Sequence, residues 1–492
     1  MAAALAFDGR IFADGQWLSS HSPVQVNTIN PADGQPGVSF TASRESEVDL
    51  VVASARTAFD DGRWSNLSPR QRRGILLRLA ELIESNGNDL ALSDSLDVGK
   101  PIMQALGEVP IAAAFVRYYA EALDKHYTGQ TVPTCKDSLE IQLMRPRGVV
   151  ASIAPWNFPL VNTALKIAPA LAAGNCVVIK PSSVSPRSAE RLALLAIEAG
   201  LPAGVLNILP GDGRTGDLLV RHAGVDMVTF TGSTETGRKI MRAIGDSTLK
   251  PMLLECGGKN PEFVFDDMAG TDLDGIAANI LGWAFANVGQ LCVARSRLYI
   301  QEQLYTPLLA RIVDQAKGMR PGHPLDPQTR MGPLSTASQR DVTTHYINKG
   351  LEEGGALLVD GRQADDAGAG FYVGPSIFAN LDEGSAVNLE EIFGPVLSIN
   401  RFNDAEDAIR LANSNEYGLA ATVWTRDIAT AQRLAAGIAS AKVRVMASPV
   451  PTEGAGLNQS AEPARQSGFG IEGGLRGMES YMRRQVVEYS FG

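Results

Sequence analysis

Residues 148–258 alternate short apolar runs with helical segments, and this regularity constrains the fold more than any other feature. The runs begin roughly 22 to 29 residues apart, each ends in Gly or Pro, and they read GVVASIAP, NCVVIKP, GVLNILPG, DMVTFTG and PMLLECGG. This spacing is typical of βαβ units, and near-continuous apolar strands indicate a sheet covered on both faces. We therefore predict a doubly wound parallel sheet that binds a ligand at the carboxyl ends of its strands.

A second α/β series begins at PEFVFDD (261–267) and extends to KVRVM (442–446). Residues 1–125 show mainly helical spacing, whereas 127–145 carry Gly, Pro and Asp with partial alternation, which predicts a strand excursion or hairpin. The tail from 478 predicts a short helix followed by a strand. The expected fold class is therefore α/β, with two α/β units and a small β element.

Charge and cysteine usage exclude several classes of protein. The chain has 44 basic and 54 acidic residues, a net charge of -10, which argues against nucleic-acid or anionic-membrane partners. The start of the chain lacks a secretory pattern, and the longest charge-free stretch, 148–165, contains two prolines and is not a membrane span. The four cysteines are scattered without CxxC spacing, so we expect no disulfide framework, no metal and a cytoplasmic location.

Two turns of the first series have side chains suited to a nucleotide. The turn after TFTG contains Gly232 and Ser233, whose backbone could bind phosphate at a helix N-terminus, or whose hydroxyl could merely cap that helix. Lys180 ends another strand, and the following turn, with Ser183, contains no carboxylate. Because a carboxylate at that place repels a 2′-phosphate, its absence leaves both NAD and NADP open.

Cys292 and Glu255 are candidates for chemistry. Cys292 follows Gly289 and Gln290 in a loop that could present N–H groups to a thiolate or an oxyanion, although a lone cysteine is usually a small buried hydrophobe. Glu255 ends a strand before two glycines, which suits a general base as well as an ion-pairing residue. Structural roles are favoured for the cysteine in the apolar strand at 176 and for the one in the predicted hairpin at 135.

Eight segments, in order, resemble the aldehyde dehydrogenase superfamily over nearly the whole chain. They are PWNFPL (155–160), NCVVIKPSSVSP, FTGSTETG, LECGGKNP, GQLCVARSR, EEIFGPV (390–396), NEYGLAATVWTRD and QSGFG followed by Glu472. DVGKP, RYYAEALDK and DPQTRMG look most like gamma-glutamyl-gamma-aminobutyraldehyde dehydrogenases and other broad-specificity members.

The resemblance implies an NAD(P)-dependent oxidation of an aldehyde to a carboxylic acid. Cys292 would attack the aldehyde, Asn157 and the Cys292 N–H would hold the oxyanion, and Glu255 would activate water to hydrolyse the thioester. Lys166 and Glu472 match positions of a proton relay. The residues expected at the cofactor, NAD or NADP, are Trp156, Lys180, Ser183, Gly213, Gly232, Ser233, Glu391 and Phe393.

Departures from the family pattern lie around the substrate. Val443–Met446 stands where the family often reads VWVN, and Ala461–Arg465 differs from a loop that lines the substrate entrance in relatives. Small or aliphatic side chains surround the nucleophile. We expect a roomy apolar pocket for bulky aliphatic or aromatic aldehydes, formed by Phe158, Leu165, Ala286, Leu291 and Val293. The alternatives are a CoA-acylating dehydrogenase and a catalytically silent binding or structural protein.

The resemblance also implies how the chain is divided. We expect a Rossmann-like dinucleotide-binding domain (1–125 and 146–256), a catalytic domain (257–448), an oligomerisation element (126–145 and 475–492) and a substrate-entrance loop region (449–474). An open edge strand should be covered by another subunit, so we expect a homodimer or homotetramer.

Overall fold

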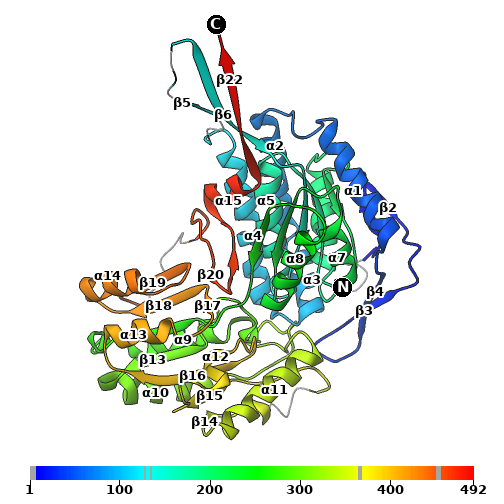
Figure 1. The fold of residues 1–492 in the computed structure, drawn as a ribbon. Coiled ribbons are helices and arrows are strands. Elements are labelled where there is room, and N and C mark those ends of the chain that lie inside the picture. The colour runs from blue at the N-terminus through cyan, green and yellow to red at the C-terminus, as the bar shows by residue number, and fades with distance from the viewer. Residues whose placement is uncertain are drawn as a thin grey trace.

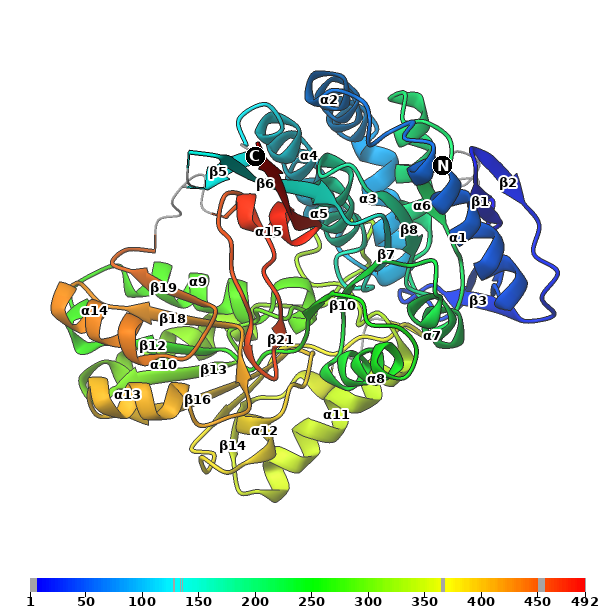
Figure 2. The same cartoon turned by 45° about the horizontal axis from the view of Figure 1, so that its top comes forward.

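The computed structural model describes residues 7–126, 129–132, 134, 136–363, 368–449 and 456–491. Two α/β units lie side by side, and a β arm projects from the first (Figures 1 and 2). The α/β fold class and the doubly wound parallel sheet are confirmed. Within the described residues, no helix is long and apolar enough to cross a membrane.

The first sheet has the strand order β2-β1-β9-β8-β7-β10-β11-β21. Its five central strands are parallel to one another, and the order reverses between β7 and β10. The central strands are β7 (Val149–Ile153), β8 (Cys176–Lys180), β9 (Leu206–Ile208), β10 (Met227–Thr231) and β11 (Met252–Glu255). The antiparallel edge strands are β1 (Ile11–Ala13), β2 (Gln16–Leu18) and β21 (Gly468–Phe469).

Helices cover both faces of this sheet, which is why its strands are apolar throughout. One face packs against α5 (Pro159–Ala172) and α6 (Arg187–Glu198), with α2 (Pro69–Ser85), α3 (Gly87–Val98) and α4 (Ile102–Ala122) outside them. The other face packs against α1 (Glu45–Asp60) and α7 (Gly213–Arg221), beside which lies α8 (Thr234–Gly245).

The helix ends have local causes in the sequence. Ser68 caps α2 by accepting the Gln71 N–H, and Pro69 occupies the first turn, where its missing N–H costs nothing. Helix α1 ends before Gly62, whose φ of +74° suits glycine. Asp212 caps α7 and Ser233 caps α8, so both helices begin at the carboxyl edge of the sheet.

The second sheet has the order β14-β15-β16-β13-β12-β18-β19, and all its strands except β14 are parallel. Neighbouring residues of β12 pack on opposite faces of this sheet. Val264 packs with the helices at 273–284 and 302–317, whereas Phe263 packs with those at 405–412 and 428–437. The strands are β12 (Pro261–Val264), β13 (Arg297–Gln301), β14 (Ala356–Val359), β15 (Ser376–Ala379), β16 (Val396–Phe402), β18 (Ala420–Trp424) and β19 (Lys442–Met446). The helices of this unit are α9 (Leu273–Ala284), α10 (Glu302–Lys317), α11 (Ala337–Glu352), α12 (Ala386–Leu389), α13 (Ala405–Ala412) and α14 (Ile428–Gly437).

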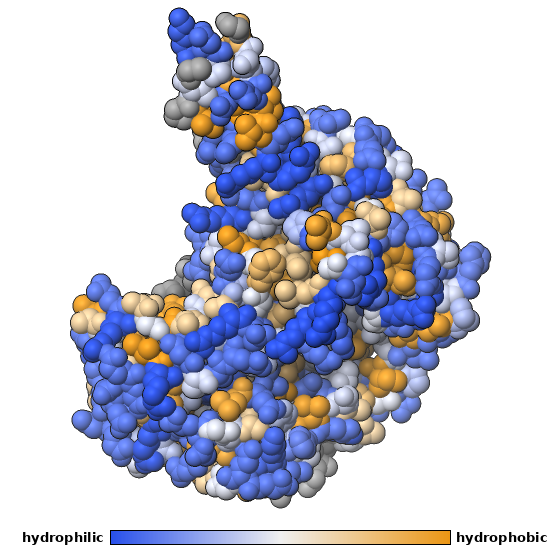
Figure 3. All heavy atoms as spheres, viewed as in Figure 1, coloured by the Kyte–Doolittle hydropathy of each residue, from blue (hydrophilic) through white to orange (hydrophobic). Residues whose placement is uncertain are grey.

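The arm is a three-stranded antiparallel sheet of β5 (Gly129–Val132), β6 (Ser138–Pro146) and β22 (Met482–Ser490). The tail strand β22 follows the short helix α15 (Gly474–Ser480) and pairs with β6 along its whole length. Hydrophobic side chains are visible on the arm (Figure 3), and on β22 Val486 is 58% and Tyr489 47% exposed. The hairpin and the helix–strand tail are confirmed; Cys135 lies outside the described residues.

Residues 1–125 are less helical than the sequence predicted. Four short strands precede α1: the edge hairpin of β1 and β2, and a ribbon of β3 (Gln25–Ile29) and β4 (Pro36–Thr41). Strands β2, β3 and β4 mix polar and apolar residues, unlike the continuous apolar runs that marked the central strands. The turn between β1 and β2 did contain a hairpin signal, since Asp14-Gly15 both have positive φ. The loop after 449 likewise contains β21 and β20 (Ala464–Arg465), which pairs with β17 (Tyr417–Gly418).

Candidate active site

A cleft of about 1180 Å³ opens at the carboxyl ends of β7, β8, β10 and β11, where the strand order of the first sheet reverses. This is the place at which open α/β sheets bind ligands. Most of the residues expected at the cofactor and nucleophile line it: Trp156, Asn157, Phe158, Lys180, Ser183, Gly213, Gly232, Ser233, Leu291, Cys292, Glu391 and Phe393.

The loop that presents Cys292 is held in an unusual backbone conformation. Asn287, Val288 and Gly289 have φ values of 48°, 60° and 73°, and a Cβ on Gly289 would lie 2.2 Å from the Gly394 carbonyl oxygen. A left-handed valine is strained, and the surrounding packing must hold it there. The nucleophile loop is therefore pressed directly against the segment that carries Glu391 and Phe393.

The Cys292 thiol is partly exposed to the cleft and fixed through its own backbone. Asn260 Nδ2 donates to the Cys292 carbonyl at 2.8 Å. Burial, followed by the carboxyls of Glu255 and Glu391, raises the pKa of the thiol to about 12, and the Val293 N–H only partly opposes this. The loop N–H thus favours the thiolate, as predicted, but burial and the two carboxyls outweigh it. A raised pKa favours the protonated thiol, so attack requires loss of the thiol proton.

Asn157 is attached to the nucleophile loop by two hydrogen bonds. Its Nδ2 donates to the Gln290 carbonyl at 3.0 Å, and Asn287 Nδ2 donates to the Asn157 carbonyl at 2.9 Å. One hydrogen of the Asn157 amide group points to protein, which leaves the other as a donor for an oxyanion formed at Cys292.

Glu255, Lys166 and Glu472 form a group of charged side chains in which Lys166 is buried and the two carboxyls are half-buried. Lys166 Nζ lies 3.0 Å from Glu472 Oε1, and the lysine side chain is fully buried. Burial, with a smaller contribution from the Glu472 carboxylate, raises the pKa of Glu255 well above its ordinary value, while Lys166 opposes the rise. A carboxyl group with a raised pKa beside a lysine–carboxylate pair is suited to take up and pass on a proton.

Glu391 and Phe393 stand at the same end of the cleft as Cys292. The Gly258 N–H donates to Glu391 Oε1 at 3.0 Å, and a Cβ on Gly257 would lie 2.1 Å from Glu391 Oε2. Burial raises the pKa of Glu391 to about 7. The Phe393 ring meets the Trp156 ring edge to face, with centroids 5.4 Å apart. A carboxylate acceptor and an aromatic wall fit a ribose and its attached ring.

The other end of the cleft fits the adenosine half of a dinucleotide. Val220 of α7 and Ile240 and Ala243 of α8 form apolar walls. Gly213 lines the cleft, and a Cβ there would meet no atom within 4 Å, so the glycine leaves room for a ligand. Ser233 caps α8, as the structural alternative predicted, and its position also opens the helix N-terminus to phosphate.

Lys180 marks the predicted ribose site. Burial lowers the pKa of its ammonium to about 8, with Asp212 opposing the shift. Asp212 itself is held by Arg44, with Nη2–Oδ2 at 2.9 Å and Nη1–Oδ1 at 3.2 Å. The charge of Asp212, one of the carboxylates that line the cleft, is thereby paired with a guanidinium.

Three residues expected in the substrate pocket, Leu165, Ala286 and Val293, are not among the described residues that line this cleft, although each is partly exposed. Sequence patterns also missed Gln290, Asn287 and Asn260 as supports of the nucleophile, and Arg44 as the partner of Asp212. Buried amides have no periodic signal; the polar run around Cys292 was the only hint. Within the described residues, no group of three His, Cys, Asp or Glu side chains could hold a metal.

The doubly wound sheet, its cleft at the carboxyl ends of the strands, the cysteine at one end of that cleft and the carboxyl group with a raised pKa together fit one class of protein, an oxidoreductase that uses a dinucleotide. Comparison with known proteins makes the family plain. Residues 17–487 match the model of the aldehyde dehydrogenase family, and the chain belongs to that family. It is an NAD(P)-dependent aldehyde dehydrogenase, as the resemblance implied.

Several relatives cover almost the whole chain. The NADP/NAD-dependent aldehyde dehydrogenase PuuC of Escherichia coli K12 is 42% identical over 90% of this chain and 89% of its own. The solved gamma-glutamyl-gamma-aminobutyraldehyde dehydrogenase of Burkholderia cenocepacia J2315 is 39% identical, covers 100% of this chain and 98% of its own, and has a TM-score of 0.95. An indole-3-acetaldehyde dehydrogenase solved with NAD+ has a TM-score of 0.95 at 38% identity, covering 99% of this chain and 98% of its own.

Proposed function

We propose that this enzyme is a hydrolytic aldehyde dehydrogenase with Cys292 as nucleophile. The Cys292 thiol releases its proton to solvent as its sulfur bonds to the aldehyde carbon, and the electron pair of the carbonyl double bond moves to the oxygen. The Asn157 amide and the Cys292 N–H hold the resulting oxyanion. NAD(P)+, when bound in the cleft, accepts the hydride that converts this adduct to a thioester. Water activated by Glu255 then bonds to the thioester carbon, and the carbon–sulfur bond breaks with its electron pair left on Cys292.

The observation that carries this proposal is the half-buried Glu255 beside the Lys166–Glu472 pair, whose charges act on its carboxyl group. A water-activating base would be a liability in a CoA-acylating enzyme, where the thioester must survive until a thiol arrives. The test is NAD(P)+ reduction with aldehyde, with and without CoA, together with identification of the product. Carboxylic acid formed without CoA supports the proposal, whereas reduction that depends on CoA would overturn it.

The cofactor site supports use of both NAD and NADP. Lys180 and Ser183 line the cleft with no carboxylate in their turn, and Arg44 neutralises Asp212 nearby. A 2′-phosphate would therefore meet a lysine and a hydroxyl rather than a free negative charge.

The substrate we propose is a bulky aliphatic or aromatic aldehyde. Phe158 and Leu291 line the cleft together with Cys292. Leu165, Ala286 and Val293 are apolar and partly exposed. Comparable turnover of succinic semialdehyde and benzaldehyde would contradict this part of the proposal.

The arm supports a homodimer or homotetramer. Strand β22 is an edge strand with exposed apolar side chains, and β19 is the edge strand of the second sheet. Residues 126–145 and 475–492 would form the oligomerisation element, 1–125 and 146–256 the dinucleotide-binding domain, 257–448 the catalytic domain and 449–474 the substrate entrance. Free thiols at Cys176, Cys256 and Cys292 support a reducing, cytoplasmic location.

A further inference from the structure

Tyr481 is a buried tyrosine whose hydroxyl reaches the proton-relay group. It lies between α15 and β22, is 1% exposed, and donates from its hydroxyl to Thr229 Oγ1 at 3.2 Å. Its backbone carbonyl accepts from Asn175 Nδ2 at 3.0 Å, which fixes the start of the tail strand against α5 and β8. The side-chain hydroxyl and the backbone carbonyl of Tyr481 are therefore both held inside the first unit.

Thr229 connects Tyr481 to Lys166. The Thr229 Oγ1 atom accepts a hydrogen bond from Lys166 Nζ at 3.3 Å as well as the one from Tyr481. Lys166 Nζ also donates to Glu472 Oε1 at 3.0 Å. An ammonium group has three hydrogens, and here two of them have fixed acceptors, so the orientation of the third is determined.

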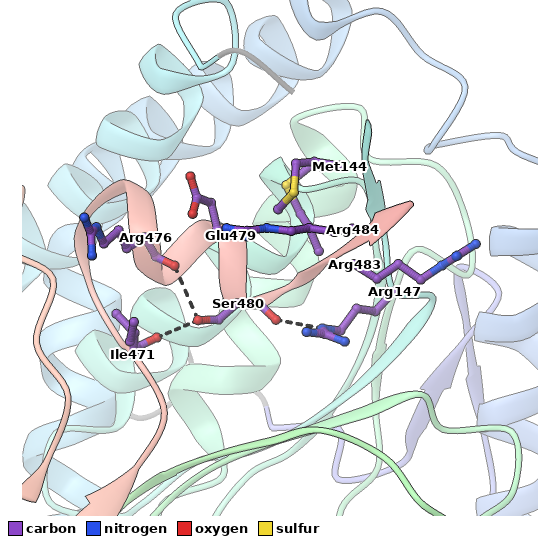
Figure 4. Close-up of a pocket in the computed structure, with 9 residues that line it drawn as sticks. Met144, Arg147, Ile471, Arg476, Glu479, Ser480, Arg483 and Arg484 are labelled. Atoms are coloured by element: carbon purple, nitrogen blue, oxygen red, sulfur yellow. Dashed lines mark hydrogen bonds between the residues drawn. The ribbon is translucent and has the colours of Figure 1, made fainter. Parts of the chain in front are cut away.

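Glu472 and Tyr481 are also tied to each other through Ser480. The Ser480 hydroxyl donates to the Ile471 carbonyl at 3.0 Å, and the Ser480 carbonyl accepts from Arg147 Nε at 2.7 Å (Figure 4). Ser480, which directly precedes Tyr481, thus also holds Ile471, which directly precedes Glu472. The Glu472 carboxylate and the Tyr481 phenol therefore belong to two segments that Ser480 connects.

Each turnover of a hydrolytic aldehyde dehydrogenase releases two protons, because aldehyde, NAD(P)+ and water give carboxylate and NAD(P)H. The proton that Glu255 takes from water must leave its carboxyl group before the next cycle. An ammonium nitrogen has no free lone pair, so Lys166 can take over this proton only by passing one of its own to Glu472, and that transfer needs the Lys166–Glu472 hydrogen bond.

Resting on the proposed function of Glu255, we propose that Tyr481, acting through Thr229, is a positioning residue that aligns Lys166 with Glu472 for the hydrolytic half-reaction. Neither Tyr481 nor Thr229 touches the substrate. Their removal should therefore slow hydrolysis of the thioester and leave thioester formation unchanged.

Tyr119 provides a matched control inside the same buried region. It is fully buried in α4 near Glu472, but its hydroxyl has no hydrogen-bond partner among the described residues. Tyr119→Phe therefore removes a buried tyrosine hydroxyl without breaking a bond to the relay. Thr229→Ser keeps the accepting hydroxyl, whereas Thr229→Val removes it.

The experiment measures the hydrolytic step by itself. An activated aryl ester acylates Cys292 without any hydride step, and mass spectrometry of the intact protein then follows loss of the acyl group. Formation of NAD(P)H in a single turnover measures the preceding steps, and steady-state kinetics with a bulky aldehyde separates kcat from KM.

We expect Tyr481→Phe and Thr229→Val each to slow deacylation about three- to tenfold, the range for one lost hydrogen bond. The double variant should be no slower than either, since both break one chain of contacts. Tyr119→Phe and Thr229→Ser should match the wild type, and KM and single-turnover NAD(P)H formation should not change.

Unchanged deacylation in Tyr481→Phe, or equal loss in Tyr119→Phe, would overturn the inference while leaving the proposed function standing. If Tyr481→Phe does not fold, Thr229→Val against Thr229→Ser decides the matter, because the tail is then untouched. Failure of the proposed function would be seen in a different variant: deacylation would continue at the wild-type rate in Glu255→Gln.

Discussion

The side-chain amide of Asn157 donates to the backbone carbonyl of Gln290 at 3.0 Å, which ties the proposed oxyanion donor to the loop of the nucleophile. Asn157→Ala should lower kcat by about 10²–10³, the cost of losing one such donor. The measurement is single-turnover NAD(P)H formation, because the oxyanion forms before the hydride leaves. A fall confined to deacylation would contradict this assignment. Thermal unfolding should shift little by comparison, which separates loss of the donor from loss of the fold.

Glu255→Gln should keep a first-turnover burst of NAD(P)H and lose steady turnover. Glu255 has a raised pKa, and only the ionised carboxylate can accept a proton from water. The deacylation rate of the wild type should therefore rise with pH through that raised pKa. The glutamine variant should show a flat profile over the same interval. A rate that falls as pH rises would mean that the protonated form acts.

Ser183→Glu should shift cofactor use toward NAD. A carboxylate beside Lys180 would repel a 2′-phosphate, and a like-charge contact in a partly exposed site should lower kcat/KM for NADP on the order of tenfold or more. Parallel assays with both cofactors measure the ratio, and Ser183→Ala serves as the neutral control. An equal loss with NAD and NADP would show that Ser183 does not discriminate between them.

Gly289→Ala should destabilise the enzyme and displace Cys292. The new Cβ would lie 2.2 Å from the Gly394 oxygen, in a backbone with φ of +73°. Gly270→Ala is the matched control: its φ is +77°, but a Cβ there meets nothing within 4 Å. The folding free energy of the control should fall only by the cost of a left-handed alanine, about 1–2 kcal/mol. In denaturant unfolding, Gly289→Ala should lose more folding free energy than the control. Its Cys292 should also react more slowly with iodoacetamide. Equal losses of folding free energy in the two variants would refute the close contact.

Val486→Glu should lower the oligomeric mass measured by light scattering. Val486 is 58% exposed on the edge strand β22, and a charge buried in an interface is costly. Leu249→Glu is the control, since Leu249 is 97% exposed and belongs to the first unit rather than to the three strands of the arm. A wild-type chain that is monomeric at micromolar concentration would end the argument for the arm as an interface.

The sequence predicted the parts of the fold that repeat. Five apolar strands at regular spacing specified the first sheet, and residues such as Ser68 and Gly62 marked helix ends. It could not place β2 or β3, which mix polar and apolar residues instead of forming continuous apolar runs. For the site, the resemblance supplied Cys292, Glu255 and Asn157, whereas periodicity alone left Cys292 as a plausible core cysteine. The pKa of its thiol could not be foreseen, because it depends on burial and on carboxyls from distant segments.

The position of Glu472 and Tyr481 near the end of the chain has a consequence for synthesis. Cys292 and Glu255 leave the ribosome long before the tail, and both sheets can pair most of their strands by then. Lys166 receives its carboxylate only when a segment 306 residues further along has emerged. If Glu472 serves the relay as proposed, a chain that stops before this segment would carry the nucleophile and lack the carboxylate partner of Lys166.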